Sequence, residues 1–139
     1  MTERFERMFL DTAPLIYFLD ADPRYAVEVR GIIYAALNSG VEVITSVVSA
    51  TEYLTLPYRT GKFEKIGAFF DFLADAGIML VPIDVAIAKK AAQIRAEYRH
   101  FKTMDALQLA SACVYGCDVF LTNDKQLCQF TELRCVTLG

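Results

Sequence analysis

The chain has 139 residues, a formal net charge of −3 and a hydrophobic fraction of 55%. This length suits a single domain over residues 1–139 with a substantial core, and no apolar run reaches the roughly 18 residues of a membrane span. The small acidic excess argues against a broad basic surface for nucleic acid, so any such site is expected to be local. The N-terminal segment lacks the long apolar core of a signal peptide, and we expect a cytoplasmic protein.

The cysteines do not form a metal-binding pattern. Cys113, Cys117, Cys128 and Cys135 include no C-x-x-C pair, and the one histidine, His100, has no second ligand near it in the sequence. Cysteine is among the residues most often buried in cores. We therefore expect reduced, buried cysteines, as is usual in a cytosolic protein.

In chain order, short apolar runs alternate with segments of helical periodicity. The strands are expected at 7–10, 41–45, 78–81, 119–121 and 133–136, the last at a sheet edge. The helices are expected at 12–19, 25–38, 47–56, 63–76 and 85–98, from about 103 to a C-cap at Gly116, and briefly at 125–129. Pro57 is expected to end the third helix.

Strands that alternate with helices predict an α/β fold with a mainly parallel sheet. In such sheets, ligand sites form outside the carboxyl ends of the strands. Asp11 and Asp124 follow two of the predicted strands. We therefore expect both carboxylates at the same edge of the sheet.

Four acidic residues stand at or near strand ends and helix starts: Asp11, Glu52, Asp105 and Asp124. Converging carboxylates repel one another unless one is protonated or a cation is bound. Oxygen-rich sites suit hard cations such as Mg²⁺ or Mn²⁺, and such ions support phosphodiester hydrolysis. For any one of these acids, a helix cap or a solvated charge is the competing role.

Several common sites are excluded by their missing motifs. The chain has no G-x-G-x-x-G for a dinucleotide and no G-x-S-x-G for a serine hydrolase. Gly61-Lys62 resembles the end of a P-loop, but Leu56 replaces the first glycine and Phe63 replaces the required Ser or Thr.

Four segments carry a family resemblance: Leu-Asp-Thr at 10–12, Ser-Ala-Thr-Glu at 49–52, Met-Asp-Ala-Leu-Gln-Leu-Ala at 104–110 and Leu-Thr-Asn-Asp at 121–124. In order and spacing they resemble the acidic motifs of the PIN-domain ribonucleases, most closely the VapC-type toxins of prokaryotic toxin–antitoxin modules. The resemblance covers the whole chain. It implies a Rossmann-like, three-layer sandwich around a central, mainly parallel five-stranded sheet.

The resemblance also implies an endoribonuclease that hydrolyses RNA phosphodiester bonds with Mg²⁺ or Mn²⁺. It carries catalysis and metal coordination onto Asp11, Glu52, Asp105 and Asp124. Glu52 is expected to ligate metal or to orient the attacking water. Gln108 stands where relatives often have His, and this difference puts nothing essential in doubt.

Neighbouring polar and basic residues are candidates for supporting roles. Thr12, Thr51, Thr122 and Asn123 are expected to hold the carboxylates or contact phosphate, with capping and turn formation as equally good alternatives. The RNA backbone is expected to bind Arg99, Lys102 and Lys125.

The helix at 63–76 is more apolar than a single core-facing stripe requires, which predicts a partner surface. The resemblance implies a homodimer and a cognate antitoxin that wraps the catalytic groove; no membrane partner is expected. The alternative is a non-catalytic RNA- or protein-binding module on the same scaffold. A receiver-like signalling domain ranks last, because Asp11 has no acidic neighbour.

Overall fold

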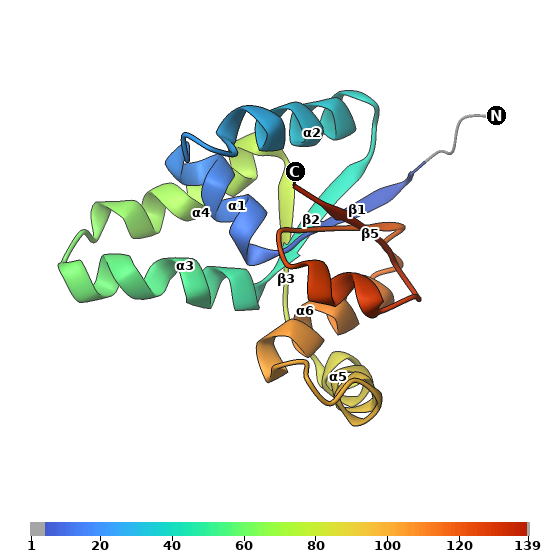
Figure 1. Ribbon diagram of the computed structural model, residues 1–139. Coiled ribbons are helices and arrows are strands. Elements are labelled where there is room, and N and C mark those ends of the chain that lie inside the picture. Colours follow the sequence, from blue (N-terminus) through green and yellow to red (C-terminus); the bar gives the residue numbers. More distant parts are fainter. Residues whose placement is uncertain (1–4, 139) are drawn as a thin grey trace.

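A five-stranded sheet forms the middle of the molecule in the computed structural model, which describes residues 5–138 (Figure 1). All strand pairs are parallel, in the order β3-β2-β1-β4-β5. The strands are β1 (Arg7–Leu10), β2 (Glu42–Ser46), β3 (Ile78–Val81), β4 (Val119–Thr122) and β5 (Arg134–Thr137). The predicted α/β class, the parallel sheet and the edge position of the last strand are confirmed.

Helices cover both faces of the sheet. They are α1 (Thr12–Asp20), α2 (Ala26–Asn38), α3 (Val47–Thr60), α4 (Glu64–Ala76), α5 (Val85–Glu97), α6 (Thr103–Val114) and the 3-10 turn η1 (Lys125–Gln129). Figure 1 shows α1 and α2 above the sheet and α5 and α6 below it. The predicted three-layer sandwich is therefore confirmed.

Alternating side chains of the central strands supply the two cores. Phe9 of β1 lies in the core beneath α5 and α6, where its ring stacks on Phe120 at 5.5 Å. Its neighbours Met8 and Leu10 lie in the opposite core with residues of α1, α2 and α4. A strand buried on both faces needs apolar residues in succession, which is why the central runs are continuous rather than alternating.

Pro57 does not end α3, and this prediction was wrong. The helix continues to Thr60 and stops at Gly61, whose φ of 69° is left-handed. Pro57 lacks one N–H and is buried, and the loss of one backbone bond is outweighed by packing of α3 on α4, where Tyr53 stacks on Phe69 at 5.1 Å. The other elements match their predicted ranges to within about one residue.

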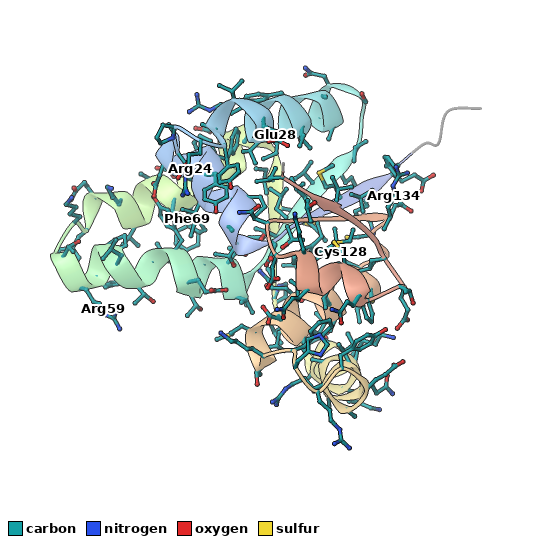
Figure 2. The ribbon with its side chains drawn as sticks, viewed as in Figure 1. Arg24, Glu28, Arg59, Phe69, Cys128 and Arg134 are labelled. Carbon is teal, nitrogen blue, oxygen red and sulfur yellow. A yellow bond between two sulfur atoms is a disulfide. The ribbon has the colours of Figure 1, made fainter. Side chains whose placement is uncertain are left out.

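The prediction of four reduced cysteines was also wrong. Cys128 and Cys135 form a disulfide with a Cα–Cα distance of 5.1 Å, visible beside the Cys128 label in Figure 2. The chain turns back after η1, so that Cys128 of η1 lies against Cys135 of β5. The spacing of the cysteines in the sequence does not reveal this contact. Cys113 and Cys117 are free thiols, and burial raises their pKa to about 11 and about 12.

No helix in the described part of the chain is long and apolar enough to cross a membrane. The N-terminal segment on which the signal-peptide prediction rests lies partly outside the described residues, which begin at Phe5.

Candidate active site

The candidate site lies where the chain order of the sheet reverses. The chain moves from β1 through β2 to β3 on one side, and from β4 to β5 on the other. Such a switch point leaves a crevice outside the carboxyl ends of the two central strands. Leu10 and Leu121 are in register there, and the Asp11 N–H donates to the Leu121 carbonyl at 2.9 Å. The backbone thus fixes Asp11 at the crevice.

Both oxygens of the Asp11 carboxylate are engaged. Oδ1 accepts a hydrogen bond from the Thr12 N–H at 2.9 Å, which caps α1, and Oδ2 accepts one from the Thr122 hydroxyl at 2.7 Å. Burial raises the pKa of Asp11 from 3.8 to about 6, the two hydrogen bonds lower it, and the charges of Asp105 and Glu52 raise it further. Asp11, Glu52 and Asp105 therefore share one electrostatic environment.

Glu52 reaches this environment from α3. Its side chain is exposed, and Oε1 accepts a hydrogen bond from the Thr12 hydroxyl at 2.9 Å. Because helical side chains point toward the helix N-terminus, a residue in the second turn of α3 can reach back to the sheet edge. The Thr12 hydroxyl holds it in that orientation.

Asp105 reaches it from the first turn of α6. The residue is half-buried, and Oδ2 accepts a hydrogen bond from the Lys102 N–H at 3.2 Å. A carboxylate in the first turn also interacts favourably with the helix dipole. Asp105 thus caps its helix while its charge acts on Asp11.

Asp124 is placed differently. It is exposed, and its Oδ1 accepts from the Gln126 N–H at 3.0 Å as the cap of η1. Its own N–H donates to the Thr122 hydroxyl at 3.0 Å, the same hydroxyl that donates to Asp11. Thr122 therefore links the two residues, although the contact to Asp124 is made through the backbone.

Two of the predicted supporting residues contact site carboxylates, and two do not. Thr12 and Thr122 donate to Glu52 and Asp11 as described. The Thr51 hydroxyl instead donates to the Val47 carbonyl within α3 at 3.1 Å. The Asn123 amide donates to the Tyr17 hydroxyl at 3.1 Å. The predicted RNA contacts Arg99, Lys102 and Lys125 are all exposed.

A buried polar cluster behind the carboxylates was not predicted. Thr45, Ser46, Ser49 and Gln108 are each at most 1% exposed, and their side chains are hydrogen-bonded to one another or to Thr12. The available signal was the occurrence of these polar residues within otherwise apolar stretches of β2, α3 and α6. Gln108, for which the sequence predicted no role, lies at its centre.

The donor chemistry fits a hard divalent cation, although the ligands are not gathered in advance. Within residues 5–138 no three acidic, histidine or cysteine side chains are grouped to hold a metal ion. The nearby donors are carboxylate oxygens, which magnesium and manganese prefer. The pKa of Asp11 is raised first by the burial of its carboxylate and then by the nearby charges of Asp105 and Glu52, and a bound cation would favour its ionised form.

Solved structures of similar fold come from bacterial toxin–antitoxin complexes. A chain of VapBC2 from Rickettsia felis, bound to a promoter DNA fragment, has a TM-score of 0.73 and 14% identity, covering 96% of this chain and 99% of that one. A chain of VapBC-1 from nontypeable Haemophilus influenzae has a TM-score of 0.71 and 16% identity, covering 94% and 97%. VapC20 from Mycobacterium tuberculosis, a toxin that cleaves the sarcin–ricin loop, has a TM-score of 0.65 and 18% identity, covering 91% and 98%.

At these identities the structural similarity establishes the fold. A comparison with curated proteins finds no match. The PIN domain model matches residues 8–133. This range contains all four predicted site acids, the whole of β2, β3 and β4, and β1 without its first residue. The chain belongs to the PIN domain family.

Proposed function

We propose that this protein is a metal-dependent endoribonuclease that hydrolyses RNA phosphodiester bonds and acts as the toxin of a toxin–antitoxin pair. The observation that carries the proposal is the Asp11 carboxylate. It is oriented by two hydrogen bonds at the switch point of the sheet, and its pKa is raised mainly by burial, with smaller contributions from the charges of Asp105 and Glu52. That the similar VapC20 cleaves RNA in the sarcin–ricin loop supports the substrate class.

Under this proposal Mg²⁺ or Mn²⁺ is held by Asp11, Glu52, Asp105 and Asp124. When bound, such an ion lowers the pKa of a water and offsets charge on the phosphate. Asp124 offers Oδ2, since Oδ1 caps η1. Rigid placement favours a ligand role for Asp11, and Glu52, the more exposed acid, is proposed as a ligand that can also orient a water as a hydrogen-bond acceptor.

The substrate is held by basic and polar side chains around the carboxylates. Arg99 and Lys102 lie in the connection that leads into α6, and Lys125 directly follows Asp124. Exposed cations beside an acidic site attract phosphates without reading sequence. Thr51 and Asn123 are the remaining candidates for phosphate contact.

An antitoxin partner is proposed because the neighbours VapBC2 and VapBC-1 were solved as toxin–antitoxin complexes. A groove of about 230 Å³ suits it, with an apolar wall of Ile16, Leu56 and Pro57 that leads to Glu52. Lys62 and Lys65 add positive charge to the same groove, and Asp20 and Glu52 add negative charge. A bound segment with apolar side chains for this wall would therefore lie beside Glu52.

A homodimer is proposed on a second apolar surface. Tyr58 and Phe70 are 60% and 44% exposed and line a depression with Val47 and Leu80. Of the apolar residues predicted to form a partner surface, Phe69 and Leu73 lie in the core, and Phe63 and Phe70 remain exposed.

The test is RNA cleavage by purified variants. Asp11→Asn and Asp105→Asn are each expected to reduce the cleavage rate at least about 100-fold, because each removes a charged metal ligand. Asp71→Asn, an exposed acid on α4, is the matched control and should cleave normally. EDTA should abolish cleavage and added Mn²⁺ should restore it.

Two outcomes would contradict the proposal. Undiminished cleavage by Asp11→Asn would contradict the proposed metal site. Wild-type protein that binds RNA yet leaves it intact with either ion would instead establish the non-catalytic binding module.

A further inference from the structure

The amide of Gln108 makes three hydrogen bonds at the centre of the buried polar cluster. Its Oε1 accepts from the Ser46 hydroxyl at 2.5 Å. Its Nε2 donates to the Ser49 hydroxyl at 2.8 Å and to the Thr12 hydroxyl at 3.2 Å. Both N–H donors and one of the two acceptor positions of the oxygen are therefore used, which sets the orientation of the amide.

The Thr12 oxygen lies within hydrogen-bond distance of Gln108, Glu52 and Ser49, the last at 3.2 Å, and the chemistry of Glu52 fixes where the Thr12 hydrogen points. An ionised carboxylate only accepts, so the single Thr12 hydroxyl hydrogen points to Glu52, at 2.9 Å. Thr12 must therefore accept from Gln108. At the other end, the Ser46 oxygen accepts from the Val48 N–H at 3.0 Å as the cap of α3, which leaves its hydrogen for Gln108.

The cluster joins the elements that carry the proposed ligands. Ser46 ends β2, Ser49 lies in α3, Thr12 begins α1 and Gln108 lies in α6. Gln108 follows Asp105 by three residues and therefore shares its side of α6. Thr12 directly follows Asp11. One amide thus ties together the elements that supply Asp11, Glu52 and Asp105.

Because the cluster is buried, its polar groups must find their hydrogen-bond partners within the protein. Gln108 is 1% exposed and Thr12 is 8% exposed. No buried side-chain nitrogen or oxygen in residues 5–138 lacks a hydrogen-bond partner. Glu52 by contrast is exposed, and a long exposed side chain samples several rotamers unless it is held. The Thr12 hydroxyl is the contact that holds it, and Gln108 and Ser49 both contact that hydroxyl, Gln108 as an N–H donor.

We propose that Gln108 is a positioning residue of the metal site: through the Thr12 hydroxyl it holds the Glu52 carboxylate beside Asp11 and Asp105. This inference rests on the proposed function. It predicts that a residue without metal contact controls metal affinity, and that it does so through Glu52.

The experiment measures Mn²⁺ binding by isothermal titration calorimetry without RNA. Gln108→Met keeps the length of the side chain and removes its hydrogen bonds, so affinity for Mn²⁺ should fall about tenfold, as for other residues that orient ligands. Gln108→His, which keeps one donor and one acceptor, should lose less. Leu109→Ala is the matched control, since it opens the core on the same helix and should lower stability without changing Mn²⁺ affinity.

A double-mutant cycle identifies the route. In a Glu52→Gln background, the further change Gln108→Met should alter Mn²⁺ affinity by less than about twofold, because the group that Gln108 positions has lost its charge. A purely structural role would give the same loss in both backgrounds. Thr12→Val removes the same link at the helix start and should match Gln108→Met even if the latter folds poorly.

Each result decides the matter. Wild-type affinity in both Gln108→Met and Thr12→Val, or equal losses with and without the Glu52 charge, would overturn the inference and leave the proposed function standing. Wild-type protein that binds no Mn²⁺ would overturn the proposed function and the inference together.

Discussion

At the scale of single residues, opposing effects act on the ionisation of Asp11. Its carboxylate is fixed by Thr12 and Thr122, which favours the ionised form, yet burial and the charges of its acidic neighbours disfavour that form and prevail. The ionised Asp11 carboxylate therefore lowers the stability of the folded, metal-free protein. Such costs concentrate at functional sites, where a ligand or a cation relieves them.

That cost predicts a pH-dependent effect of Asp11→Asn on stability. The folded state holds the Asp11 proton more tightly than the unfolded state, so the free energy of unfolding falls as pH rises from about 3.8 to about 6 and is level above. This difference in pKa corresponds to at most about 3 kcal/mol of unfolding free energy, and partial exposure of Asp11 to solvent reduces that figure. Asp11→Asn should therefore stabilise the metal-free protein by about 1–2 kcal/mol at pH 7.5.

Urea unfolding in EDTA at pH 7.5 and pH 4 measures this effect. The stabilisation should largely vanish at pH 4, where Asp11 is protonated in the folded protein and less costly to bury. Asp71→Asn should show no such pH dependence. A variant less stable than wild type at pH 7.5 would show that the hydrogen bonds of Asp11 outweigh its desolvation.

At the scale of elements, glycine has opposite effects on stability at the end of a helix and in its interior. Gly77 ends α4 with a φ of 77°, a left-handed conformation that favours glycine. Gly67 lies inside the same helix, and an added Cβ there would meet nothing within 4 Å. The same residue type therefore stabilises one position and weakens the other.

Two alanine substitutions in α4 should shift stability in opposite directions. Gly67→Ala is expected to raise the free energy of unfolding by about 0.5–1 kcal/mol, because alanine loses less backbone entropy in a helix. Gly77→Ala should lower it by about 1–2 kcal/mol, because alanine is strained at positive φ. Urea unfolding of both variants is the measurement, and changes of the same sign would contradict this account.

At the scale of the whole molecule, α3 and α4 project together beyond the sheet, at the left of Figure 1. Figure 2 shows Phe69 between this pair and α1, with Arg59 pointing away at the far end. The pair and α1 enclose the groove that leads to Glu52. This arrangement places the proposed antitoxin groove beside Glu52, one of the proposed catalytic carboxylates.

The proposed antitoxin groove predicts the effect of a charge at Leu56. Leu56 is 65% exposed, so Leu56→Asp should preserve folding while introducing a charge into the apolar wall. Affinity for the cognate antitoxin, measured by calorimetry with the purified partner, should fall at least about tenfold. Val27→Asp, at an 88% exposed site on α2, is the control. Equal affinity for both variants would place the antitoxin elsewhere.

The sequence by itself determined most of the fold. Short apolar runs such as the one ending at Leu10 predicted the strands, and helical periodicity predicted helices such as the one at 85–98. These signals are local: periodicity and capping depend on residues a few positions apart. The same reasoning put Asp11 and Asp124 at the same edge of the sheet, outside the carboxyl ends of two strands, and only the structure shows that these strands, β1 and β4, are neighbours.

Only the tertiary structure decided the features that depend on distant partners. Pro57 stays within α3 because α4 packs against that helix, and Cys128 finds Cys135 because the chain turns back onto the edge strand. Gln108 is separated from Thr12 by 96 positions in the chain, yet hydrogen-bonds to it. A polar residue in an apolar helix has no evident purpose until its partners are known, because a hydrogen bond requires two groups within about 3 Å in space, whatever their separation in sequence.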